Sequence, residues 1–277
     1  MQGFDPWTAF GHDVAQRYDD DLRGDEAETV AFLAGLAGDR PALEFAIGTG
    51  RIALPLAAAG VRVDGIEVSP DMVDRLRAKP DGAGLDVAMG DMTTTSTGRV
   101  YGVVYLVFNT IANLLTQDDQ VRCFDNAARH LEPGGVFVVE CLVPGDVARP
   151  AGQYVDAEVV GVDHVVLDVC RYDPSTQILD ENHVRISADG IRLAPIQQRL
   201  SYPSELDLMA RLAGLRLRQR WGGWRGEPYD AAARRHVSVY EKAVASSEST
   251  ARATTGTARP TSAESPGPTS TSAASTA

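Results

Sequence analysis

Residues 41–50 read PALEFAIGTG, an apolar run that ends in the turn Gly48-Thr49-Gly50. An apolar pattern typical of a helix follows at once, with Ile52, Leu54 and Leu56. Together these patterns predict a strand, a tight turn and a helix. Glycines let a turn pass close to a ligand, and a helix N-terminus attracts negative groups. We therefore expect a nucleotide-like ligand at this turn.

The turn alone leaves two cofactors open. Gly48-x-Gly50-x-x-Ala53 fits the relaxed dinucleotide fingerprint, and Glu67 lies at about the distance expected of a ribose-binding acid, which favours NAD. S-adenosylmethionine (SAM) is carried by domains with a similar turn and an acid at its start, where Glu44 stands here. The rest of the chain has to decide between them.

Length and charge restrict the partners. The 277 residues suffice for one large domain or two small ones. With 38 acidic against 26 basic residues, the net charge of −12 argues against a nucleic-acid partner. The chain has no apolar run long enough to span a membrane and no signal-peptide pattern at its start, so we expect a cytoplasmic protein without a membrane partner.

Strand and helix patterns alternate from residue 41 to residue 143. The expected strands after the first are 61–68, 85–89, 100–108 and 136–141, and the expected helices include 25–38, one that starts at Ser69-Pro70-Asp71, and 117–131. This alternation predicts a parallel sheet covered by helices on both faces.

The pattern changes after Pro144. Segments 155–171, 176–187 and 191–201 predict three or four antiparallel strands, followed by a helix over 203–212 and strands over 215–221 and 236–241. Residues 1–24 are predicted to form an N-terminal arm or lid. Residues 25–243 form the main domain, with an insertion at about 150–201. Residues 244–277 are mostly Ser, Thr, Ala, Gly and Pro, which predicts a disordered tail.

The order of the motifs from residue 15 to residue 243 resembles the class I SAM-dependent methyltransferase family. The motifs are Glu44 to Gly50, Glu67, Gly90-Asp91-Met92, Phe108-Asn109-Thr110 and the turn Leu131 to Gly135. The resemblance implies SAM rather than NAD. It also implies a Rossmann-like, mostly parallel seven-stranded α/β sheet with helices on both faces, and an antiparallel insertion as a roof over the methyl acceptor. One departure is Ala46, where a glycine is commonest.

A looser likeness concerns the acceptor. The segments LMARLAGL (208–215), WGGW (221–224) and GEPY (226–229) look like the tail of bacterial small-molecule methyltransferases. Some of these methylate the nitrogen of amino sugars or of peptide amino termini. The likeness implies a small-molecule acceptor.

The resemblance also implies which residues bind the cofactor. Glu67 would accept both ribose hydroxyls, because a carboxylate is an acceptor facing two donors. Asp91 would accept from the adenine amino group beside the Met92 N–H, and Glu44 would tether the glycine turn or the cofactor's amino group. The full expected set is Tyr18, Glu44, Ala46, Gly48, Gly50, Glu67, Val68, Met72, Asp91, Met92, Phe108 and Asn109.

Tyr18 and Asn113 are the candidates for catalytic contacts, with packing and helix capping as the alternatives. Trp221, Trp224 and Tyr229 surround a glycine-rich loop and either line the acceptor pocket or pack a terminal hairpin. The five histidines are read as structural, with His130 on the surface and His164 and His183 in the roof. Cys123, Cys141 and Cys170 are too scattered for a disulfide framework or a zinc site.

The expected chemistry is direct in-line displacement, because the methyl group of SAM is already activated and the protein supplies mainly positioning. An amine acceptor needs only to be neutral, whereas a hydroxyl has to lose its proton. The sequence shows no obvious His/Asp pair or metal cluster, which favours a nitrogen acceptor. O- or C-methylation and a non-catalytic SAM-binding protein remain the alternatives.

Overall fold

The computed structural model describes residues 1, 3–4, 8–20, 23–145, 147–149 and 152–244. Residues 245–277, which make up nearly all of the predicted disordered tail, lie outside the described residues. None of the described helices is long and apolar enough to cross a lipid bilayer.

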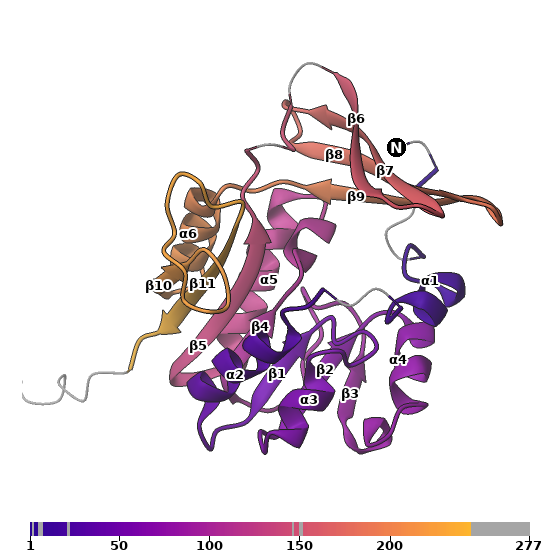
Figure 1. Cartoon of the computed structure of the whole chain (residues 1–277). Coiled ribbons are helices and arrows are strands. Elements are labelled where there is room, and N and C mark those ends of the chain that lie inside the picture. The colour runs from indigo at the N-terminus through magenta and orange to yellow at the C-terminus, as the bar shows by residue number, and fades with distance from the viewer. Residues whose placement is uncertain (2, 5–7, 21–22, 146, 150–151, 245–277) are drawn as a thin grey trace, which may run out of the picture. The chain divides into compact units, whose positions relative to one another are not determined.

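Seven strands form one sheet in the order β10-β11-β5-β4-β1-β2-β3 (Figure 1). Strand β11 is antiparallel to both of its neighbours, and the other pairs are parallel. The strands are β1 (Ala42–Phe45), β2 (Val63–Glu67), β3 (Asp86–Met89), β4 (Tyr101–Leu106), β5 (Leu131–Leu142), β10 (Leu215–Trp221) and β11 (Arg235–Lys242). The predicted fold class is confirmed.

Helices cover both faces of this sheet. They are α2 (Glu26–Ala37), α3 (Ala53–Ala58), α4 (Pro70–Arg77), α5 (Gln117–His130) and α6 (Pro203–Leu212). Leu33, Leu56 and Leu76, from α2, α3 and α4, belong to one core. Phe124 and Leu206, from α5 and α6, belong to the other. Burial on both faces explains why β4 is apolar along its whole length.

The start of α4 follows its sequence signals. The Ser69 hydroxyl accepts a hydrogen bond from the Met72 N–H at 3.2 Å, and Pro70 occupies the first turn. This start lies just beyond the carboxyl end of β2. β1 pairs with β2 on one side and with β4 on the other. The order in which the chain adds strands to the sheet therefore reverses at β1. In open α/β sheets ligands bind outside the carboxyl ends of the strands at such a point.

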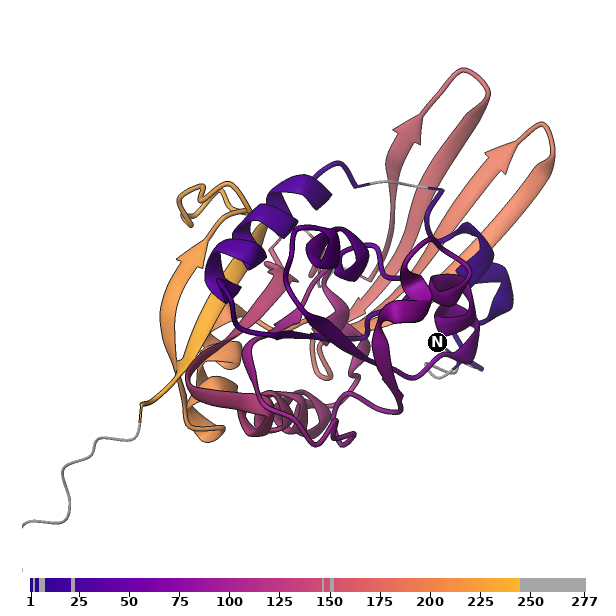
Figure 2. The same ribbon diagram turned by 90° about the horizontal axis from the view of Figure 1, so that it is seen from below.

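The inserted segment forms a second sheet of four antiparallel strands, which we call the roof. Its strands are β6 (Gln153–Val160), β7 (His164–Asp173), β8 (Ile178–Ser187) and β9 (Gly190–Arg199). The first predicted segment, 155–171, is two strands, because the chain turns at Gly161 and its N–H donates to the His164 carbonyl at 2.9 Å. Figure 2 shows the hairpins β6–β7 and β8–β9 extending together beyond the seven-stranded sheet.

One face of the roof is apolar in its outer part, where it is open to solvent, and polar at its base, where Arg171, Asp180 and Gln197 lie. Val155 pairs with Val169, and their exposed fractions are 58% and 40%, while Leu193 on the same face is 63% exposed. Where this face meets the rest of the chain, Arg199 bonds to Gln120 of α5. At its base, this face is therefore directed toward α5.

The N-terminal arm contains the short helix α1 (His12–Arg17). Its first residue reaches the roof, where the Met1 amino group donates to the Asp180 carboxylate at 2.7 Å. Farther along, the Ser69 hydroxyl at the start of α4 donates to the Phe10 carbonyl at 2.7 Å. The arm thus runs from the roof to the carboxyl edge of the seven-stranded sheet (Figure 1).

Candidate functional site

A cavity of about 210 Å³ lies at the carboxyl ends of β1, β2 and β3 and beside the turn that follows β4. It collects side chains from five separate parts of the chain. They are Phe10, Tyr18, Ala46, Gly48, Ile66, Glu67, Val68, Met72, Gly90, Asp91, Met92, Thr110, Asn113, Leu114, Leu115 and Asp119. The sequence predicts thirteen residues as cofactor or catalytic contacts. Nine of them are in this lining: Tyr18, Ala46, Gly48, Glu67, Val68, Met72, Asp91, Met92 and Asn113.

The glycine turn forms one wall through residues with left-handed backbone. Gly48 has φ +56°, and Ala46, where the family commonly has glycine, has φ +54°. An L-residue in this conformation costs on the order of 1–2 kcal/mol. The turn therefore keeps its shape at Ala46 despite the added methyl group.

Glu67 holds the turn to the end of β2. Its Oε2 accepts from the Gly48 N–H at 2.8 Å, and its Oε1 accepts from the N–H groups of Val68 and Ser69 at 2.9 and 2.8 Å. Burial raises the pKa of the carboxyl group, against the opposing effect of these three hydrogen bonds. A carboxylate has about four acceptor positions, so three are used within the protein. Glu67 is both a structural anchor and a lining residue with remaining capacity.

Asp91, like Glu67, both makes structural hydrogen bonds and lines the cavity. Its Oδ1 accepts from the Thr93 N–H at 2.8 Å, and its Oδ2 accepts from the Thr93 hydroxyl at 2.7 Å. These bonds form an Asp turn of the kind that the dipeptide Gly-Asp favours. The turn leaves Asp91 and Met92 in the cavity lining.

Both candidate catalytic residues are in the lining. Tyr18 follows α1, and its ring packs edge-to-face on Phe10 with 6.4 Å between the ring centres. Asn113 ends the short 3₁₀ helix η2 (Thr110–Asn113), which follows β4. The arm and the β4 turn thus place two uncharged polar side chains in one cavity.

Four predicted cofactor contacts are not in the lining, and each has a structural reason. Glu44 is turned into the sheet, where its carboxyl group accepts from the Tyr105 hydroxyl at 2.9 Å. Gly50, at φ +77°, lies against α4, so that an added Cβ would come within 2.3 Å of Leu76 Cδ1. The geometry gives both a role in holding the turn rather than in lining the cavity.

Phe108 and Asn109 make up the rest of this group. Both have left-handed backbone, with φ +58° and +59°. The turn directs the Asn109 side chain toward β5, where its Oδ1 accepts from the Leu142 N–H at 3.1 Å and lies 3.2 Å from Cys141 Sγ. The chain next to them, from Thr110 onward, supplies the lining instead.

Sequence reasoning missed several lining residues. Leu114 and Leu115 follow Asn113 directly, and their place after a buried strand was a usable signal. Thr110, in contrast, was expected beside Asn109 at the methionyl end of the cofactor, and it is in the lining. Phe10 comes from an arm without a motif, and Asp119 reads as an ordinary first-turn acid of α5. No sequence signal distinguishes these two.

The structure decides between the two alternatives for Trp224 and changes the interpretation of His130. Trp224 is 4% exposed and packs edge-to-face on Phe32 with 5.5 Å between ring centres, so it belongs to the core and not to the cavity. His130, predicted on the surface, is 2% exposed. Its Nε2 accepts from the Thr97 N–H at 3.1 Å and its Nδ1 lies 2.9 Å from the Asn126 carbonyl. The surface prediction was wrong because this face of α5 packs on the sheet.

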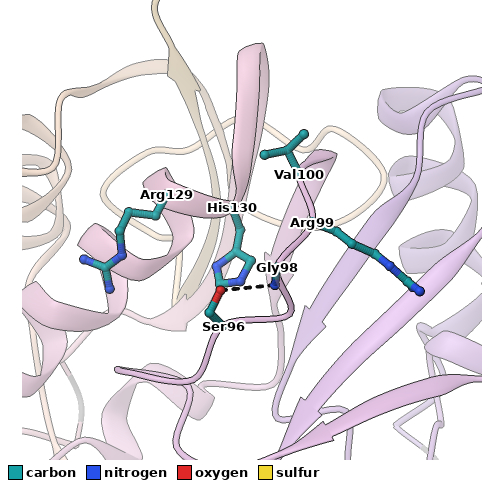
Figure 3. A pocket seen from close by; sticks show the side chains of 6 residues that line it. All are labelled: Ser96, Gly98, Arg99, Val100, Arg129 and His130. Carbon is teal, nitrogen blue, oxygen red and sulfur yellow. Dashed lines mark hydrogen bonds between the residues drawn. The ribbon is translucent and has the colours of Figure 1, made fainter.

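A second cavity, of about 540 Å³, lies at the amino ends of β4 and β5. It is lined by Ser96, Gly98, Arg99, Val100, Arg129 and His130 (Figure 3). Its two arginines point away from each other. Arg99 is ion-paired with Asp64 and Asp86 at 2.9 Å, and Arg129 with Asp125. Its charged groups are thus used within the protein, and the smaller cavity is the better candidate site.

The residues of the smaller cavity fit SAM. Glu67 offers a hydrogen-bond acceptor with remaining capacity, as ribose hydroxyls would require. Ile66, Met92 and Leu114 offer an apolar surface for a flat base, and Asp91 lies beside them. Thr110 and Asn113 supply polar groups on the β4 side.

Comparisons with known proteins agree with this fit. A family model described as a methyltransferase domain matches residues 42–135. Among curated relatives, the cypemycin N-terminal methyltransferase of a Streptomyces species is 29% identical over 207 residues, which cover 73% of this chain and 83% of the relative. A dTDP-3-amino-3,6-dideoxy-alpha-D-glucopyranose N,N-dimethyltransferase of Streptomyces fradiae is 32% identical over 143 residues, 49% of this chain and 55% of the relative.

Among solved structures, the CcbJ methyltransferase from Streptomyces caelestis is 40% identical, with a TM-score of 0.81. The match covers 87% of this chain and 100% of that one. Because the likeness extends over the whole of a relative of this identity, the chain belongs to the SAM-dependent methyltransferase family, and SAM is its cofactor.

Proposed function

We propose that the protein transfers the methyl group of SAM to an amine nitrogen of a natural-product or amino-sugar type acceptor. Two relatives support nitrogen as the target. One is named for the amino terminus of a peptide and the other for an amino sugar. Bound SAM supplies a methyl group that is already activated by its sulfonium centre.

The observation that carries the proposal is that Tyr18, Thr110 and Asn113 share one lining with Glu67 and the glycine turn. All three have oxygen atoms that accept hydrogen bonds and carry no charge. Such acceptors can orient the N–H groups of a neutral amine, so that its lone pair points along the line of displacement. The protein then acts by positioning, which is a large term when a reaction joins two bound molecules. The methylated nitrogen afterwards loses its proton to solvent.

Cofactor binding is divided among the other lining residues in this proposal. Glu67 accepts from the ribose with its remaining capacity, and Asp91 accepts from the adenine amino group beside the Met92 N–H. Ala46 and Gly48 lie along the methionyl part, while Val68 and Met72 pack against the nucleoside. Glu44, Gly50, Phe108 and Asn109 support the shape of the site from outside the lining.

In this proposal the methyl acceptor is bound by segments of the chain outside the seven-stranded sheet. We propose that the arm, residues 1–24, acts as a lid and that the insertion at about 150–201 is the roof over the acceptor. The apolar roof face, with Val155, Val169 and Leu193, favours an acceptor with a largely uncharged body. The net charge of −12 opposes a nucleic-acid partner, and we place the reaction in the cytoplasm, without a membrane partner.

Matched acceptors test the proposal. The protein would be incubated with methyl-labelled SAM and pairs of compounds that differ at one group: an amino sugar and its hydroxyl counterpart, or a peptide with a free and an acetylated amino terminus. Mass spectrometry should find one or two labelled methyl groups on nitrogen in the amine of a pair only. Label on oxygen or carbon, or SAM binding without transfer to any amine, would contradict it.

A further inference from the structure

Arg51 joins three separate segments of the cofactor site although it does not line the cavity itself. It follows Gly50 directly in the glycine turn. Its guanidinium carbon lies 4.0 Å from the ring centre of Phe108, after β4, and 4.8 Å from that of Tyr18, in the arm. Its Nη2 also donates to the Tyr18 hydroxyl at 3.3 Å. One side chain therefore connects the turn, the arm and the end of β4.

The Phe108 side of this contact is fixed by other groups. Phe108 has φ +58°, and its N–H donates to Glu140 Oε2 at 2.8 Å. The guanidinium carbon of Arg23 lies over the same ring, 4.5 Å from its centre. Phe108 thus gives Arg51 a surface whose backbone is held in place.

The Tyr18 side depends on Arg51 to a greater degree. The arm is anchored on each side of Tyr18, at Phe10 by the Ser69 hydroxyl and at Asp19 by Thr49 and Lys79. These bonds hold the Phe10 carbonyl and the Asp19 side chain, and they do not involve the Tyr18 ring. The ring and its hydroxyl are held by Arg51 and by the edge contact with Phe10.

The groups around the Arg51 guanidinium indicate that it acts by stacking on aromatic rings. Its Nε is buried without a hydrogen bond, and among the residues that the structure describes no carboxylate lies within ion-pair distance of its guanidinium group. Its close contacts among the described residues are the two ring faces and one hydroxyl, while its charge also acts at longer range on the carboxyl groups of Glu44 and Glu26. A planar guanidinium stacks on rings in a way that the compact ammonium of lysine does not reproduce.

The geometry points to Arg51 as a positioning residue for methyl transfer: it holds the Tyr18 ring in the cavity lining, and SAM binding depends on it through Tyr18. The proposal concerns the cofactor, so it stands apart from the identity of the acceptor. A simple need for positive charge near the turn would predict that lysine replaces Arg51 well. Stacking predicts that it does not.

A double-mutant cycle on SAM affinity tests this. Calorimetry would compare the wild type, Arg51→Gln, Tyr18→Leu and the double variant. We expect each single change to weaken SAM binding roughly 5- to 30-fold, as for loss of a desolvated cation–π contact. The double variant should bind no more weakly than the weaker single variant, because both changes remove the same contact. Arg17→Gln, an exposed arginine beside Tyr18, is the matched control and should bind as the wild type does.

Hydrogen–deuterium exchange of residues 8–20 gives a second measurement. Exchange should rise in Arg51→Gln and stay at the wild-type level in Arg17→Gln. Arg51→Lys keeps the positive charge and an aliphatic side chain but lacks the planar guanidinium group. It replaces Arg51→Gln as the test variant if Arg51→Gln does not fold. Loss of SAM affinity in Arg51→Lys supports stacking. Wild-type SAM affinity in Arg51→Lys would overturn the proposal. So would a loss of SAM affinity in the double variant equal to the product of the losses in the two single variants, because the two residues would then act independently.

Discussion

The hydroxyl of Tyr105 in β4 donates a hydrogen bond to the carboxyl group of Glu44 in β1, with 2.9 Å between the oxygens. Glu44 is 3% exposed. Burial raises its pKa to about 8, although the Tyr105 bond and the charge of Arg51 act in the opposite direction. A neutral carboxyl group inside the sheet is a poor partner for the ammonium group of a cofactor. This relationship supports a structural role for Glu44.

The raised pKa predicts how stability changes with pH. Between the ordinary value of 4.5 and about 8, the folded protein keeps a proton on Glu44 that the unfolded chain has lost. The contribution of Glu44 to the free energy of unfolding therefore falls as pH rises through this window. Glu44→Gln removes that dependence and keeps an acceptor for Tyr105. Relative to the wild type it should gain stability from pH 5 to pH 8, by up to a few kcal/mol.

Urea unfolding at pH 5, 6, 7 and 8 measures this difference directly. Other buried acids titrate in both proteins, and their effects cancel in the comparison. A difference between the two proteins that stays constant over this range would show that Glu44 is ionised in the folded state.

The glycine turn gives a matched pair of substitutions. Gly50→Ala places a Cβ within 2.3 Å of Leu76 Cδ1 and 3.1 Å of Leu54 Cγ, at φ +77°. Gly48→Ala meets only the Ala46 carbonyl, at 3.9 Å, at φ +56°. Both pay about 1–2 kcal/mol for the left-handed backbone, and only Gly50→Ala adds a clash of about 1–3 kcal/mol. Thermal unfolding should therefore rank the wild type above Gly48→Ala, and Gly48→Ala above Gly50→Ala; the reverse ranking of the two variants would refute this packing.

Glu67→Gln tests the anchor at the end of β2. One oxygen becomes an amide NH₂ among three backbone N–H donors and the proposed ribose site. Loss of a charged acceptor costs about 1.5–3 kcal/mol, so SAM should bind roughly 10- to 150-fold more weakly in calorimetry. Asp118→Asn, in the exposed first turn of α5, is the control. Unchanged affinity in Glu67→Gln would remove Glu67 from the cofactor site.

The fold was largely predictable because its signals are local. The apolar run before Gly48, the cap at Ser69 and the unbroken apolar stretch of β4 each depend on neighbours in the chain. Side-chain direction was less predictable. Glu44 and Asn109 stand next to lining residues in sequence, yet one turns into the sheet and the other toward β5, because of partners that are 61 and 33 residues away. Such long-range contacts have no local pattern.

Trp224 shows the same limit and gives a further test. Its place in a glycine-rich loop left pocket and packing open, and its contact with Phe32 in the core favours packing. Trp224→Ala should cost about 3–5 kcal/mol of stability, as for other buried aromatic residues. Tyr229→Ala, at a residue that is 36% exposed, should cost much less. A Trp224→Ala protein as stable as the wild type, with a raised KM for the acceptor, would return Trp224 to the pocket.

We assign the cavity between the glycine turn, Glu67 and Asn113 as the cofactor site. A crystal structure of the protein with S-adenosylhomocysteine tests it most directly. We expect ribose oxygens within hydrogen-bond distance of Glu67, the adenine ring beside Asp91 and Met92, and Tyr18 over the homocysteine part. Density for the ligand in the cavity of Ser96, Arg99 and His130, or a ligand that leaves Glu67 without contact, would contradict this assignment.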